Sequence, residues 1–136
     1  MTVIVTGAAG FLGEAVVAQL RERDRPVVAY DIAPDETLER RAGADDGIHL
    51  VRGNMTSFPE LSNAVTEYGV KAAIPLAYFD VPSGNLVDAA KQYPYQASNV
   101  NNTGFNNVLE VARQLDIETV VWPSSGVVYG PRTTTA

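Results

Sequence analysis

Three glycines join a short apolar segment to an amphipathic segment near the start of the chain. Residues 3–6 read Val-Ile-Val-Thr, and Gly7, Gly10 and Gly13 follow at regular spacing. Gly7 permits a tight turn, Gly10 lets the backbone approach a pyrophosphate, and Gly13 lets a helix pack closely on the strand. The helix N-terminus then offers free N–H groups and a partial positive charge to phosphates. The segment therefore predicts a strand–turn–helix unit that can bind a nucleotide phosphate.

Short apolar runs recur along the chain and predict a parallel sheet. Most are unbroken rather than alternating, which is typical of strands covered on both faces. Because helical segments separate the runs, their order predicts right-handed βαβ units in a Rossmann-type α/β fold. We expect a doubly wound parallel sheet with strand order 3-2-1-4-5. The expected strands are residues 3–6, 26–30, 48–52, 71–77 and 119–122.

The segments between these runs are expected to be helical. An amphipathic pattern favours a helix over 11–24, and the longest helix is expected to begin at Pro94 or Tyr95 and to end at residue 115. Ser57 is expected to cap the third helix, with Glu60 completing a capping box. The expected helices are residues 11–24, 34–44, 58–68 and 94–115.

Composition limits the domain count and the classes of partner. The chain has 136 residues, 46% of them apolar, which suits one domain with a continuous core. Its 16 acidic and 10 basic residues give a net charge of −6 without a basic cluster, so nucleic acid and anionic membranes are not expected partners. The absence of cysteine excludes disulfides, thiol catalysis and thiolate metal sites, and the scattered acids do not suggest a metal site.

The start of the chain carries no pattern of an export signal. Val3 follows Met1 almost directly, without a basic segment or a long apolar segment before it. No apolar run approaches the roughly 20 residues of a membrane-spanning helix. The sequence therefore predicts a cytoplasmic protein with no membrane partner.

Asp31 closes the second apolar run, about 18 residues beyond the last glycine of the turn. A carboxylate at this position can accept hydrogen bonds from both hydroxyls of an adenosine ribose. It would also repel a 2′-phosphate, and no arginine follows immediately, so NAD is the expected cofactor rather than NADP. The alternative is that Asp31 only caps the loop before Pro34.

Three motifs in order resemble one known family. Residues 6–13 look like a TGxxGxxG turn, residues 99–112 resemble a long central helix, and residues 120–130 resemble a strand that ends in SSxxVYG. The chain thus resembles the extended short-chain dehydrogenase/reductase superfamily, specifically the NAD-dependent epimerase/dehydratase family of nucleotide-sugar enzymes. The likeness covers nearly all 136 residues.

The resemblance implies a set of cofactor-binding positions. In chain order, these positions lie at the turn that binds the pyrophosphate, beside the adenosine ribose, beside the adenine, at the fourth strand and on the nicotinamide side. Asn54 replaces the aspartate that the family usually has beside adenine, and its amide oxygen is expected to accept from the adenine amino group. The implied residues are Gly7, Ala8, Gly10, Phe11, Leu12, Gly13, Asp31, Asn54, Met55, Leu76, Ala77, Tyr78 and Asn99.

The resemblance also implies that Ser125 is the catalytic hydroxyl of the family. A hydroxyl at the carboxyl end of a central parallel strand points into the crevice where such sheets bind ligands. The alternative is that Ser124 and Ser125 only satisfy backbone groups of a loop. Tyr93 and Tyr95 either line a substrate cleft or pack a loop on the sheet. His49, the only histidine, is interpreted as a core or surface residue.

The catalytic Tyr-x-x-x-Lys pair of the family is not found in this chain. The only lysines are Lys71 and Lys91, and neither has a tyrosine four residues before it. We therefore interpret residues 1–136 as the amino-terminal, NAD-binding part of a longer epimerase, dehydratase or reductase that transfers hydride to or from a small-molecule hydroxyl or carbonyl. This part alone is expected to be inactive, and its uncovered surfaces favour self-association into a homo-oligomer.

Two other functions fit the same sequence. A non-catalytic Rossmann module could sense a dinucleotide or serve as an interaction surface. A flavodoxin-like or other α/β domain could use the glycines only for structure. A Tyr-x-x-x-Lys pair beyond Ala136 would favour the enzyme, and a lack of NAD binding would favour the structural interpretation.

Overall fold

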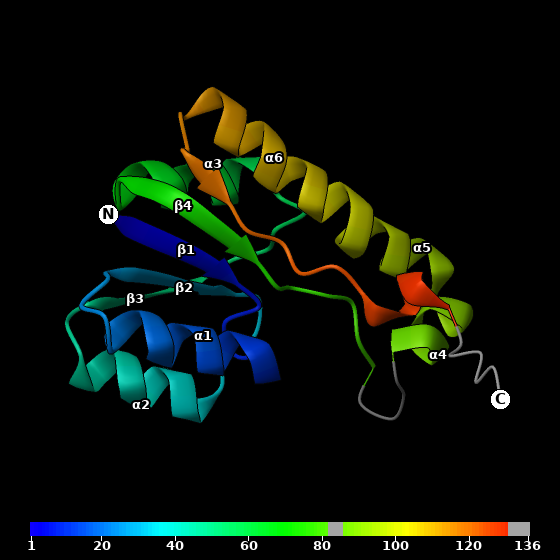
Figure 1. Cartoon of the computed structure of the whole chain (residues 1–136), viewed down its shortest axis with the longest axis horizontal. Helices are drawn as coiled ribbons and strands as arrows, with labels where there is room; N and C mark the ends of the chain where they lie inside the picture. Colours follow the sequence, from blue (N-terminus) through cyan, green and yellow to red (C-terminus); the bar gives the residue numbers. More distant parts are fainter. Residues whose placement is uncertain (82–85, 131–136) are drawn as a thin grey trace, which may run out of the picture.

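A five-stranded parallel sheet forms the centre of the molecule in the computed structural model, which describes residues 1–81 and 86–130 (Figure 1). The strand order is β3-β2-β1-β4-β5, so the predicted order 3-2-1-4-5 and the Rossmann-type α/β fold are confirmed. The strands are β1 (Thr2–Thr6), β2 (Val27–Asp31), β3 (Ile48–Arg52), β4 (Val70–Pro75) and β5 (Thr119–Val120).

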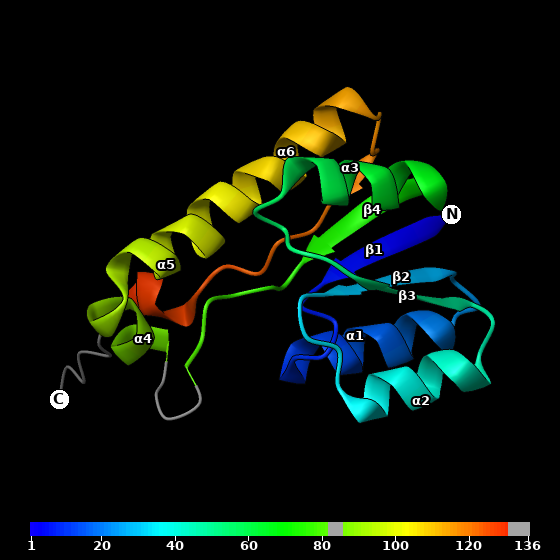
Figure 2. The ribbon, with the colours of Figure 1, turned by 180° about the vertical axis from the view of Figure 1, so that it is seen from behind.

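Helices cover both faces of the sheet. Figures 1 and 2 show α1 (Phe11–Arg21) and α2 (Glu36–Ala44) against one face, and α3 (Phe58–Glu67) and α6 (Phe105–Gln114) against the other. In β2, Val27 and Ala29 pack toward the first pair of helices. Val28 and Tyr30 pack toward the second pair. This two-sided burial explains why the strands read as unbroken apolar runs.

The longest helical segment has the expected extent but not the expected regularity. It consists of α5 (Pro94–Ser98), a π-helical turn η1 (Asn99–Gly104) and α6, which continue directly into one another. Within η1, Asn101 Oδ1 accepts a hydrogen bond from Phe79 N (2.9 Å). Gly104 packs on Met55, whose Cγ would lie 2.7 Å from a Cβ at this position. The π turn thus coincides with two contacts to loops at the end of the sheet, which a helical periodicity cannot predict.

Several predicted boundaries are wrong by a few residues. The first helix ends at Arg21, because Asp24 takes a φ of 53° and turns the chain toward β2. The fourth strand begins at Val70 and ends at Pro75, and the fifth strand holds only two residues. A short helix that was not predicted, α4 (Leu86–Gln92), precedes α5. Among the described residues, no helix is long and apolar enough to cross a membrane.

The predicted capping box is also wrong. Ser57 precedes α3 but its side chain makes no capping hydrogen bond. Glu60 Oε2 instead accepts from Asn54 N (2.8 Å), in the loop that leaves β3. The side chain of Asp35 does cap a helix, since its Oδ1 accepts from Leu38 N (2.8 Å) at the start of α2. Glu60 therefore fixes the loop after β3 rather than the first turn of α3.

Candidate functional site

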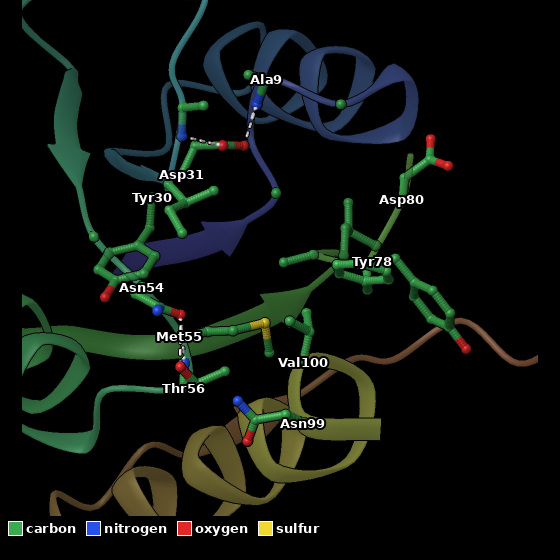
Figure 3. Close-up of a pocket in the computed structure, with 18 of the residues that line it drawn as sticks. Ala9, Tyr30, Asp31, Asn54, Met55, Thr56, Tyr78, Asp80, Asn99 and Val100 are labelled. Carbon is green, nitrogen blue, oxygen red and sulfur yellow. Dashed lines mark hydrogen bonds between the residues drawn. The ribbon is translucent and has the colours of Figure 1, made fainter. Parts of the chain in front are cut away.

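A cavity of about 700 Å³ opens at the carboxyl ends of the strands. Its walls come from the glycine turn after β1, the end of β2, the loop after β3, the loop after β4 and the helical turns α5 and η1 (Figure 3). From β1 the chain adds β2 and β3 on one side of the sheet and then β4 and β5 on the other side, so the strand order reverses between β1 and β4. Ligands of parallel α/β sheets bind at such a switch point. The volume lies within the range of small-molecule and cofactor sites.

The glycine turn is shaped by close packing on two sides. Gly7 has a φ of 70°, and a Cβ on it would lie 2.6 Å from Ala77 N in the loop after β4. A Cβ on Gly13 would collide with Gly7 O. Gly10 precedes α1 without a side-chain cap, and it lines the cavity. The turn therefore leaves the N-terminus of α1 open toward the cavity, as an anion site requires.

Asp31 connects the glycine turn to the loop after β2. Its Oδ2 accepts from Ala9 N (3.0 Å) and its Oδ1 accepts from Ala33 N (2.9 Å), as the dashed lines in Figure 3 show. A carboxylate oxygen can accept more than one hydrogen bond, so each oxygen keeps capacity for a further donor. Asp31 thus caps its loop, as the alternative interpretation held, and its carboxylate also forms part of the cavity wall.

Asn54 is fixed by an Asx turn at the end of β3. Its Oδ1 accepts from both Thr56 N and Thr56 Oγ1, each at 2.9 Å. Its main-chain N–H donates to Glu60 Oε2. Two donors from Thr56 thus already occupy the amide oxygen that is expected to accept from an adenine amino group.

Three side-chain hydrogen bonds hold the loops after β3 and β4 in place. Met55 is 5% exposed, packs beneath Gly104, and accepts at its carbonyl from Asn107 Nδ2 (3.0 Å). The chain after β4 is fixed by Thr6, whose carbonyl accepts from Leu76 N (3.0 Å) and whose Oγ1 accepts from Ala77 N (3.3 Å). The Asn101 contact to Phe79 N extends this restraint. These contacts fix the spacing between the glycine turn and η1.

Tyr30 contributes an unusual polar group to the same region. The side chain lies in the cavity wall, yet its hydroxyl is buried against Gly53 without a hydrogen-bond partner among the described residues. Burial, followed by the charge of Glu60, raises the pKa of Tyr30 to about 12. The hydroxyl therefore stays protonated at neutral pH. The residues that the structure describes hold no cluster of three metal-ligating His, Asp or Glu side chains.

Most of the predicted cofactor-binding residues line this one cavity. Those brought together are Gly7, Gly10, Asp31, Asn54, Met55, Leu76, Ala77, Tyr78 and Asn99. Ala8 and Gly13 are buried beneath the turn, whereas Phe11 is 94% exposed and Leu12 is 54% exposed at the start of α1. At these last two positions only the main chain can serve a phosphate at the turn.

Ser125 lies apart from the cavity wall. It is exposed, and its carbonyl accepts from Val128 N (3.2 Å) at the short helix η2 (Gly126–Tyr129). The chain leaves the sheet after only two residues of β5, and Ser125 is not among the residues that line the cavity. Tyr95 lines the cavity, whereas Tyr93 packs edge-on against Phe79 with ring centroids 6.2 Å apart.

Further cavity residues were not identified from the sequence. Seven of the ten lie in the loops that follow β1 to β4, and this position in a parallel sheet is the signal that could have identified them. Tyr95 and Asn99, from α5 and η1, are named as candidates from the sequence, but their neighbours Gln96 and Val100 are not. The additional residues are Ala9, Tyr30, Ile32, Ala33, Gly53, Thr56, Phe79, Asp80, Gln96 and Val100.

Curated relatives match nearly the whole of this chain but only part of their own length. It is 31% identical over 140 residues to UDP-glucuronate 4-epimerase 4 from Arabidopsis thaliana, a match that covers 98% of this chain and 31% of that protein. It is 30% identical over 132 residues to 3 beta-hydroxysteroid dehydrogenase type 7 from Mus musculus, covering 94% and 33% respectively. The chain thus spans about a third of the length of these relatives.

Solved structures show the same arrangement. UDP-glucose 4-epimerase from Thermus thermophilus, in complex with NAD, superposes with a TM-score of 0.77 at 28% identity over 93% of this chain and 38% of that chain. A GalE-like L-threonine dehydrogenase from Cupriavidus necator, in its holo form, gives a TM-score of 0.75 at 30% identity, covering 92% and 38%. The model of the NAD dependent epimerase/dehydratase family matches residues 3–136. The glycine turn, the sheet order and this match across the sequence together show that the chain belongs to the NAD-dependent epimerase/dehydratase family.

Proposed function

We propose that this chain binds NAD as the cofactor-binding part of an NAD-dependent epimerase, dehydratase or reductase. The observation that carries the proposal is the double hydrogen bonding of Asp31, which holds a carboxylate between the glycine turn and the cavity. Such a carboxylate suits the two hydroxyls of a ribose whose phosphate lies at the turn. It disfavours the 2′-phosphate of NADP, because two negative charges would then lie side by side.

The residues present suit the rest of the cofactor. The pyrophosphate would lie beside the Gly7–Gly10 turn at the N-terminus of α1, where the first main-chain N–H groups of the helix favour negative charge. Gly7 packs directly on the main chain after β4, since a Cβ on it would lie 2.6 Å from Ala77 N. The nicotinamide end would face Tyr78 and Asn99, on the other side of the glycine turn from Asp31.

The substrate side of the cavity is the end lined by Tyr78, Asp80 and Tyr95. Bound NAD would accept and return a hydride there, so the substrate class is a small molecule with a hydroxyl or carbonyl group, of which a nucleotide sugar is the first candidate. Ser125 is the proposed hydroxyl that hydrogen-bonds this substrate. Because the chain carries no Tyr-x-x-x-Lys pair, turnover is not expected from residues 1–136 alone.

The cofactor assignment is tested by calorimetric titration with NAD and with NADP. The wild-type chain is expected to bind NAD at least about tenfold more tightly than NADP, and Asp31→Asn is expected to weaken NAD binding and narrow that difference. Asp46→Asn removes the same charge from an exposed turn outside the cavity and serves as the matched control. Equal affinity for the two dinucleotides in the wild type would contradict the assignment to NAD, and an absence of binding would favour a structural role for the glycines.

A further inference from the structure

The position of the base follows from the order of groups in a dinucleotide, and this step rests on the proposed function. With the phosphates at the glycine turn and the ribose at Asp31, the base must lie beyond the ribose, away from β1. The cavity wall there consists of Ile32 and Ala33 after β2 and of residues 53–56 after β3. Ile32 and Met55 contribute apolar side chains to this lining and Asn54 contributes a polar one, so Asn54 is the candidate to contact the edge of a base.

The amide group of Asn54 has a fixed orientation. Thr56 N is a main-chain donor, so the Asn54 atom that it contacts at 2.9 Å must be the oxygen, and the reversed amide would place two donors against each other. Thr56 Oγ1 lies 2.9 Å from the same oxygen. Among the described residues, the Nδ2 group makes no hydrogen bond of its own. The polar group of Asn54 that remains available to a ligand is therefore the Nδ2 donor.

The neighbouring side chains of Glu60, Tyr30 and Thr56 do not offer a base a hydrogen-bond acceptor at this position. Glu60 Oε2 bonds to Asn54 N, and Glu60 is not part of the cavity wall. The Tyr30 hydroxyl is buried against Gly53, so a base in the cavity cannot reach it. The Thr56 hydroxyl proton is directed to Asn54 Oδ1. A purine edge that meets Asn54 therefore meets an N–H donor.

We propose that Asn54 reads the base as a hydrogen-bond donor, so that the site does not select the 6-amino group of adenine. An amino group is itself a donor and gains no hydrogen bond from Nδ2, whereas the 6-oxo group of hypoxanthine can accept one. Adenine can still accept at a ring nitrogen. The consequence is a base subsite that accepts both 6-amino and 6-oxo purine dinucleotides.

The test compares NAD with nicotinamide hypoxanthine dinucleotide by calorimetry, using the 136-residue chain. The wild type is expected to bind the two within about threefold of each other. Asn54→Asp keeps an oxygen for the Asx turn and replaces the donor by a second carboxylate oxygen, so it should shift the ratio of dissociation constants about tenfold in favour of NAD. Asn63→Asp, an exposed position on α3, introduces the same charge outside the cavity and is expected to leave the ratio unchanged.

The outcomes separate this inference from the proposed function. If neither dinucleotide binds to the wild type, the proposed function fails and the inference fails with it. If both bind but the wild type already prefers NAD by about tenfold or more, or Asn54→Asp leaves the ratio unchanged, only the role of Asn54 is overturned. Should Asn54→Asp fail to fold, Asn54→Ala is the second variant. It should weaken binding of the hypoxanthine dinucleotide more than binding of NAD, and an equal loss for both would also overturn the inference.

Discussion

The two ends of the candidate site are built differently. The cofactor end, which comprises residues 7–13, Asp31 and residues 53–56, is held by main-chain packing and by side-chain oxygens that accept main-chain hydrogen bonds. The segment after β5, residues 121–130, follows a strand of two residues, and its residues 121–125 and 128–130 are exposed. Trp122 is 51% exposed while its ring contacts Phe105 with centroids 4.7 Å apart, and Tyr129 is 89% exposed.

This difference shows which part of the site the described residues determine by themselves. The cofactor end is held by hydrogen bonds of its own and by close contacts with Ala77 and Gly104. In the segment after β5, large apolar side chains such as Val121 and Trp122 remain exposed, and burying such side chains is worth about 1.5–3 kcal/mol each. The glycine turn, Asp31 and residues 53–56 are therefore held by close packing and hydrogen bonds, whereas the segment after β5 keeps several large side chains exposed.

The largest effect is expected from a methyl group in the glycine turn. Gly13→Ala places a Cβ against Gly7 O and Ala8, both main-chain contacts that cannot move aside. We expect a loss of about 3 kcal/mol in the free energy of unfolding, measured by denaturant titration, together with loss of detectable NAD binding. If the turn were loosely packed, as the segment after β5 is, the variant would unfold at the wild-type midpoint.

Gly43→Ala is the matched control for this substitution. Gly43 lies in α2, and nothing lies within 4 Å of the position of its Cβ. Alanine there should stabilise the chain by about 0.5–1 kcal/mol, because glycine is unfavourable inside a helix. Opposite signs for the two Gly→Ala variants would show that the collision, rather than the residue type, causes the loss.

Local patterns account for the parts of this molecule that the sequence predicts. The glycine spacing, the unbroken apolar runs and Asp31 each depend on neighbours within one βα unit, so the sheet order and a common cavity for the glycine turn and Asp31 could be predicted. The Asx turn of Asn54 and Thr56 is also local, and an Asn-x-Thr sequence after a strand indicates it. The expectation for the Asn54 oxygen followed the family's aspartate and took no account of this turn.

Other features depend on contacts between distant segments. Asn101 reaches Phe79 N, and Gly104 lies against Met55, so the π turn exists because a helix meets two loops that are far away in the sequence. Helical periodicity in the sequence does not predict contacts of this kind. The same applies to Ser125, since a motif predicts a strand end but does not predict how short β5 is or where the chain turns afterwards.

A smaller effect is expected from Tyr30, whose ring packs against Gly53 of the cofactor end. Its hydroxyl is buried without a partner among the described residues, so Tyr30→Phe should stabilise the chain by about 1 kcal/mol at neutral pH. The pKa of Tyr30 is raised from 10.0 to about 12, which means that folding favours the neutral phenol. The stability that this shift contributes is fully present below the unfolded pKa of 10.0 and is lost as the pH rises through about 12. Denaturant titrations from neutral pH to about pH 12 should therefore show a steeper alkaline loss in the wild type than in Tyr30→Phe.

Tyr129→Phe is the control for that pH series. It removes a hydroxyl from an exposed ring in the segment after β5 and should change neither the stability at neutral pH nor the alkaline slope. An identical alkaline slope in wild type and Tyr30→Phe would mean that the Tyr30 hydroxyl is hydrated, and the contrast between the two ends of the site would then be smaller than described.

The smallest effect is expected at Ser125. Comparing Ser125→Ala with Asp31→Asn tests directly whether the two ends act separately. Ser125 is exposed and is not part of the cavity wall, so Ser125→Ala should change the free energy of unfolding by less than about 0.5 kcal/mol. NAD affinity, measured by the same calorimetric titration, should stay within about twofold of the wild type, whereas Asp31→Asn lowers it. A loss of NAD affinity of about tenfold in Ser125→Ala would show that the segment after β5 folds over the cofactor in solution. In that case the substrate side would contribute to dinucleotide binding, and the separation of the two ends would be a property of the unliganded chain alone.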